Sequence, residues 1–138
     1  MQTTKKKKQI KKLKKIIKKK KLIYNFYKKN LSFIKKIIFK KPSKNCNPVY
    51  WFSNIFIKEK KKLINFLNTK NIQTREAFYP LNLQPCFKKT NIVKNINKKF
   101  SVSKKIYDTC LSLPSSYNLS NREQDLIIKN IKKFYGKK

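Results

Sequence analysis

Residues 71–85 read NIQTREAFYPLNLQP, and this stretch contains the backbone signals around which the rest of the chain is organised. Asn71 follows a run of apolar residues with helical spacing, and asparagine tolerates the left-handed conformation that ends a helix. Residues 72–75 predict a brief strand. The two prolines that follow, Pro80 and Pro85, break regular structure, and the polar run at residues 90–99 predicts a loop.

A strand and a helix are expected immediately upstream. Residues 49–57 are rich in aromatic and β-branched side chains, which predicts a strand. Glu59 then opens a short helix that ends before Asn71. The apolar side chains expected in the core from these two elements are Trp51, Phe52, Phe56, Leu63, Ile64, Phe66 and Leu67.

Farther upstream, residues 9–31 have the apolar spacing of a long amphipathic helix whose other face is almost entirely lysine. Like charges one turn apart destabilise such a helix, so it needs packing or counterions. An alternative is a basic helix that lies on a membrane surface. We divide the chain into residues 1–44, the lysine-rich helix and its connection, and residues 45–138, a small domain.

Downstream of the prolines, residues 104–110 predict a short helix and residues 111–114 a short extended segment. Ser120 and Glu123 form a capping-box pattern just before an apolar run, which predicts a terminal helix over residues 121–135. The order of these elements indicates an α+β fold, with a small sheet packed on helices and a long helix at the N-terminus.

The chain has 138 residues and a formal net charge of +33. Of its 38 basic residues, 36 are lysines and two are arginines, Arg75 and Arg122. Such a charge predicts weak, salt-sensitive, nonspecific binding to polyanions. However, lysine occurs here with asparagine, isoleucine, phenylalanine and tyrosine, as in proteins from genomes rich in adenine and thymine. We attribute most of the charge to that base composition, because a dedicated nucleic-acid binder would use more arginine.

The three cysteines, Cys46, Cys86 and Cys110, are widely spaced, and the chain has no histidine. This predicts free, packed thiols in a reducing compartment and no metal site. The longest uncharged stretch, residues 45–57, is too short to span a membrane, and the N-terminus lacks the apolar core of a secretory signal. We therefore expect a cytoplasmic protein.

Residues 71–85, read as a whole, resemble a signature of the DegT/DnrJ-like sugar aminotransferases, which usually reads G-I-x-T-R, an aromatic-proline pair, and L-H-x-Q-P. The blocks NPVYWF at residues 47–52, FSVS at 100–103 and LSLPSSYNLS at 111–120 resemble further parts of the same family in the same order. Several blocks in the right order are far more specific than one short motif.

The resemblance implies the C-terminal domain of a type I aminotransferase, in enzymes that use pyridoxal phosphate and are usually homodimeric. These enzymes transfer an amino group, usually from glutamate, to a keto-sugar carried on a nucleotide. The resemblance also places residues 71–85 at the mouth of the active site. Arg75 and Tyr79, and then Asn82 and Gln84, become the candidate substrate-side residues.

This chain departs from the family pattern at Asn82, which replaces a histidine and cannot exchange a proton near neutral pH. The family's Schiff-base lysine, its acidic partner for the pyridine nitrogen and its phosphate cradle all lie upstream of the matching region. No lysine and no pair of acidic residues has a spacing that indicates an independent catalytic site.

Three hypotheses follow from these observations. The chain completes a sugar aminotransferase whose cofactor-binding part is a separate chain, or it is an inactive gene remnant, or it is a lysine-rich module that binds polyanions.

Overall fold

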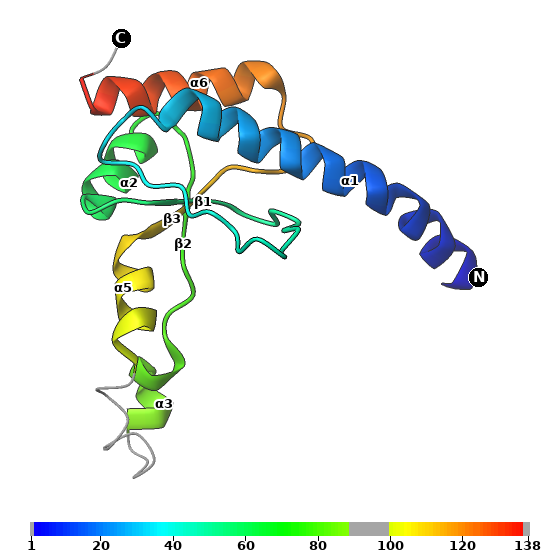
Figure 1. The fold of residues 1–138 in the computed structure, drawn as a ribbon, viewed down its shortest axis with the longest axis horizontal. Coiled ribbons are helices and arrows are strands. Elements are labelled where there is room, and N and C mark those ends of the chain that lie inside the picture. Colours follow the sequence, from blue (N-terminus) through cyan, green and yellow to red (C-terminus); the bar gives the residue numbers. More distant parts are fainter. Residues whose placement is uncertain (1, 89–99, 137–138) are drawn as a thin grey trace.

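The computed structural model describes residues 2–88 and 100–136 and confirms the α+β class, with a small antiparallel sheet packed on helices (Figure 1). The loop predicted at residues 90–99 lies outside the described residues. The elements in chain order are α1 (Gln2–Leu31), β1 (Ser53–Phe56), α2 (Lys60–Asn68), β2 (Arg75–Glu76), the 3₁₀ turn η1 (Leu81–Leu83), α3 (Pro85–Lys88), α5 (Ser101–Thr109), β3 (Cys110–Leu113) and α6 (Asn121–Phe134).

The sheet has the order β1-β3-β2, with β3 antiparallel to both neighbours. All four residues of the central strand are buried. Its buried serine, Ser112, donates a hydrogen bond of 2.7 Å to Asn54 Oδ1 of β1, so the polar side chain has a partner inside the fold. The strand that carries Arg75, β2, therefore lies at one edge of this three-stranded sheet and pairs with β3.

Helices α1 and α6 run side by side across the top of Figure 1 and complete the core. Gln124 Nε2 of α6 donates to the carbonyl of Ile23 of α1 at 2.7 Å and joins the two helices. The Tyr27 hydroxyl of α1 donates to the carbonyl of Pro114 at 2.9 Å and joins α1 to the segment after β3. The buried apolar cluster is made by Ile23, Tyr27, Leu31, Ile34, Ile37, Ile55, Ile57, Leu63, Leu67, Ile72, Leu111, Leu113, Ile127, Ile128 and Ile131.

The predicted N-terminal helix is present, but only part of its apolar stripe is buried. Ile23 and Tyr27 lie in the core, whereas Ile10 and Leu13 are 67% and 50% exposed. The reason is geometric: the first half of α1 extends beyond α6 and the sheet, toward the N-terminus in Figure 1. The division into residues 1–44 and 45–138 stays a prediction.

The strand predicted over residues 49–57 is shorter than expected, because the chain turns sharply before it. Tyr50 has a φ of 53°, which no residue in a strand adopts. The ladder therefore begins only at Ser53, and Trp51, expected in the core, is 64% exposed. Phe52 and Phe56 are half-buried. The expected brief strand at residues 72–75 is also displaced, to Arg75–Glu76.

Signals at helix ends were predicted correctly. Asn71 has a φ of 55° just after α2, as expected for a left-handed helix end. The predicted helix and extended segment near residues 104–114 appear as α5 and β3. The irregular region after Pro80 contains two short helical turns: Pro80 directly precedes η1, and Pro85 is the first residue of α3, a position that proline tolerates.

The capping box begins α6 as predicted. Ser120 Oγ accepts from the amide of Glu123 at 3.2 Å, and Glu123 Oε2 accepts from the amide and the hydroxyl of Ser120 at 2.8 and 2.7 Å. These hydrogen bonds hold the pKa of Glu123 below its ordinary value. The cap joins the loop after β3 to the helix that packs on α1.

We expect Ser120→Ala to lower the free energy of unfolding by about 1 kcal/mol, because the side-chain cap is lost. The contribution of Glu123 is present above the carboxyl's unfolded pKa of about 4.3 and is lost as the pH falls through the lower folded value. Urea unfolding at neutral pH and at about pH 3 measures both effects. A variant as stable as the parent at neutral pH would show that the cap contributes nothing.

Two of the three cysteines differ from the expectation of packed thiols. Cys46 and Cys86 are exposed, because both lie in surface segments, whereas Cys110 is buried in β3 and burial raises the pKa of its thiol. Of the helices in the described ranges, none combines the length and the apolar character that crossing a membrane requires.

Candidate functional site

Arg75 lines a groove of about 1030 Å³ that is bounded by α1, the segment before β1, the chain from Lys70 into β2, the end of β3 with the loop after it, and α6. The antiparallel pairing of Arg75 with Ser112 brings β2 to this position. The lining residues are Lys20, Trp51, Phe52, residues 70–75, residues 112–116, Leu119, Glu123, Leu126 and Ile127. The groove thus joins parts of the chain that are far apart in sequence.

The groove has an excess of positive charge. Lys20, Lys70 and Arg75 line it, and Glu123 is the acidic residue among the lining side chains. Glu123 is held in the helix cap and stays ionised, so the three cations and this one carboxylate leave a net charge of +2 on the lining. Such an arrangement favours an anionic ligand, and the arginine can bind a carboxylate or phosphate through two parallel hydrogen bonds.

Lys20 has a fixed position in this groove. Its Nζ donates to the carbonyl of Ser115 at 2.6 Å and to the carbonyl of Trp51 at 3.1 Å, and it lies 5.2 Å from the centroid of the Trp51 ring. Partial burial lowers the pKa of Lys20. No local pattern in the sequence distinguishes this lysine from the others, because only the fold brings α1 to the loop after β3.

The exposed indole of Trp51 is held beside the groove by an unusual backbone. The neighbouring residue Tyr50 has a φ of 53°, which is an outlier for a bulky side chain. Its ring stacks on Tyr24 of α1 with centroids 3.9 Å apart, and this contact offsets the strain. Strained backbone of this kind is frequent at binding sites.

The other three predicted residues lie beyond the groove. Tyr79 is 45% exposed, and its ring makes an edge contact with Tyr107 of α5, with centroids 5.1 Å apart. Asn82 lies in η1 and Gln84 follows it, and both are half-buried. None of these three is among the residues that line the groove around Arg75. In the described structure the four candidates share one segment but do not converge on one cavity.

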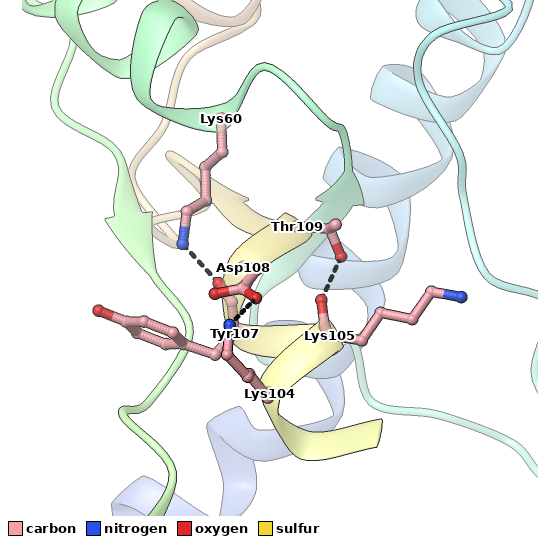
Figure 2. A network of polar contacts seen from close by, with 6 residues as sticks. All are labelled: Lys60, Lys104, Lys105, Tyr107, Asp108 and Thr109. Atoms are coloured by element: carbon pink, nitrogen blue, oxygen red, sulfur yellow. Dashed lines mark hydrogen bonds and ion pairs between the residues drawn. The ribbon is translucent and has the colours of Figure 1, made fainter. Parts of the chain in front are cut away.

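Lys60, at the start of α2, is a further residue that its sequence pattern does not single out. Its side chain is 4% exposed, and Nζ lies 2.7 Å from Glu76 Oε1 of β2. It also donates to the carbonyl of Tyr107 (Figure 2) and lies 4.4 Å from the centroid of the Tyr107 ring. Among the lysines whose side chains the structure describes, it is the buried one.

The family is decided by comparison with known proteins. The model of the DegT/DnrJ/EryC1/StrS aminotransferase family matches residues 1–132, which is nearly the whole chain. The chain belongs to this family. The resemblance of residues 71–85 and its flanking blocks to DegT/DnrJ-like enzymes is thereby confirmed.

Among curated relatives of this DegT family member, GDP-perosamine synthase from Escherichia coli O157:H7 is 29% identical over 119 residues. The match covers 84% of the chain and 30% of the relative.

Two solved structures agree with this assignment at the level of the fold. PseC from Helicobacter pylori, an aminotransferase involved in the biosynthesis of pseudoaminic acid, matches with a TM-score of 0.80 and 15% identity over 94% of the chain and 35% of PseC. A DegT DnrJ EryC1 StrS aminotransferase from Brucella abortus matches with a TM-score of 0.70 and 22% identity over 88% of the chain and 31% of its own length. The chain therefore spans about a third of these relatives.

The described residues do not fit a complete pyridoxal-phosphate site. A Schiff base needs a lysine amine that is free to react in a shaped pocket. The buried amine of Lys60 is held by Glu76 and a carbonyl, and the partly buried amine of Lys20 by two carbonyls. We therefore assign no step of cofactor chemistry to the described part of this chain.

Proposed function

We propose that this chain supplies the substrate-facing C-terminal part of a pyridoxal-phosphate-dependent sugar aminotransferase, and that the cofactor-binding part is provided by a separate chain. The observation that carries the proposal is the cationic groove, where Arg75 and two lysines surround an open space beside an exposed tryptophan. Membership of the family supports amino transfer as the reaction.

We further infer that the substrate is a keto-sugar carried on a nucleotide, with glutamate as the amino donor. Nucleotide-linked sugars carry phosphates, which match a groove lined by Lys20, Lys70 and Arg75. The relative GDP-perosamine synthase supports a nucleotide-linked sugar by its name. Tyr79, Asn82 and Gln84 are proposed as further substrate contacts, which the second chain would have to bring together with Arg75.

Co-expression with the reading frame immediately upstream tests the proposal. We expect the two chains to copurify with the visible absorbance of bound pyridoxal phosphate, and the complex to transfer an amino group from glutamate to a nucleotide-linked keto-sugar. The chain expressed alone is the control, and it should bind no cofactor. A chain that never copurifies with a cofactor-binding partner would instead be an inactive remnant of the family.

The net charge of +33 carries a separate prediction for the chain alone. We expect weak binding to DNA, RNA and heparin alike, and a steep loss of affinity as salt rises, because the interaction is with phosphate or sulfate charge alone. Fluorescence anisotropy with labelled oligonucleotides over a salt series measures this. Tight binding with a preference for one nucleic acid would favour the polyanion-binding module over the aminotransferase.

A further inference from the structure

We propose that Lys60 is a positioning residue that fixes the register of β2 on β3 and so determines that Arg75 faces the groove. The proposal starts from the location of Lys60 in the first turn of α2, where a positive charge is unfavourable because the helix dipole is positive at that end. Burial of an ammonium group adds a further penalty unless it is paired. No contact within α2 offsets these two unfavourable terms, because the partners of Lys60 that the structure describes lie on other elements.

The groups that pair with Lys60 lie on two other elements, β2 and α5. Glu76 Oε1 of β2 is 2.7 Å from Nζ, and α5 provides both the carbonyl and the ring face of Tyr107 (Figure 2). The ammonium group therefore connects α2, β2 and α5 at one point. In Figure 2 the side chain reaches down from α2 toward the helix that carries Tyr107.

The register of β2 has few other constraints. The strand consists of Arg75 and Glu76, whose partners on β3 are Ser112 and Leu111. Successive residues of a strand point to opposite faces, so a slip by one residue would exchange the directions of Arg75 and Glu76. Because Lys60 holds Glu76 on one face, Arg75 is directed to the other face, where it lines the groove.

The same contact extends to the second candidate residue. The Tyr107 ring, whose face Lys60 covers, also makes the edge contact with Tyr79. Lys60 and Tyr107 thus restrain both ends of the segment from Arg75 to Tyr79. The effect of this restraint on substrate binding rests on the proposed function, whereas the register itself is a property of the chain alone.

The test uses the full-length chain labelled for NMR. We expect Lys60→Met to remove the cross-strand contacts between Arg75 and Ser112 and to speed amide exchange in β2 by at least about tenfold, while β1, β3 and α6 stay protected. Lys61→Met, which changes the exposed neighbour in the same helix turn, should leave β2 unchanged. Lys60→Arg keeps the charge and its donors and should restore the contacts.

A Lys60→Met variant that keeps the Arg75 to Ser112 contacts and the exchange rates of β2 would overturn the proposal. If that variant unfolds globally, Glu76→Gln decides, because Glu76 is 45% exposed and its change leaves the core intact. Local loss of β2 protection in Glu76→Gln supports the register role, and retained protection refutes it. These readouts need no enzyme activity, so an inactive complex with an intact register effect would refute the proposed function alone.

Discussion

Leu111→Ala is expected to lower the free energy of unfolding by about 2–5 kcal/mol, because it leaves a cavity in the centre of the core. Leu111 is fully buried in β3, between Ile55 of β1 and Glu76 of β2. Its side chain belongs to the apolar cluster that α1, α2 and α6 share. Since natural domains are stable by only about 5–15 kcal/mol, this loss is a large fraction of the total stability.

Urea unfolding followed by circular dichroism measures the change, and a high salt concentration in the buffer limits repulsion among the lysines. Leu126→Ala is the matched control, because it makes the same substitution at a leucine of α6 that is 53% exposed. We expect the control to change stability by about 0.5 kcal/mol or less. Equal losses in the two variants would contradict a core centred on β3.

Local signals account for the parts of the fold that the sequence predicted. The capping box before α6 involves residues three positions apart, and the left-handed turn at Asn71 depends on asparagine's own conformational range. The apolar spacing of α2 likewise has a short range. Such features depend on neighbouring residues along the chain, so they can be predicted from the sequence without knowledge of tertiary contacts.

The errors arise where a distant contact overrides the local preference. The aromatic run before Ser53 favours a strand, but Tyr50 turns into the left-handed region and stacks on Tyr24 of α1. Trp51 is therefore exposed beside a lysine instead of buried. In α1, helical spacing predicted the helix but not that Ile10 and Leu13 of its apolar stripe would be exposed.

The candidate site shows the same division. The family resemblance drew attention to Arg75, but its groove forms only when β2 pairs with β3 and Lys20 of α1 packs against the loop that follows. Lys60 could not be distinguished among 36 lysines by composition. Its one sequence signal is its location just after Glu59, where a helix start disfavours a cation.

In the complex of this chain with its proposed cofactor-binding partner, Arg75→Met is expected to lower kcat/KM for the nucleotide-linked keto-sugar by about 10- to 100-fold. That range corresponds to the loss of charge-assisted hydrogen bonds worth about 1.5–3 kcal/mol. The loss should appear mainly as a higher KM, because Arg75 is proposed to bind substrate and takes no part in proton transfer. Steady-state kinetics with varied sugar substrate measures it.

Arg122 provides the matched control, since it is the other arginine of the chain and lies exposed at the start of α6. Arg122→Met removes the same charge from the same molecule, so it should leave kcat/KM within about twofold of the parent if only local contacts matter. Arg75→Lys separates charge from geometry, because lysine keeps the charge but loses the planar fork of donors. Equal losses in Arg75→Met and Arg122→Met would show that the groove attracts substrate through net charge alone, and an unchanged Arg75→Met would remove Arg75 from the site.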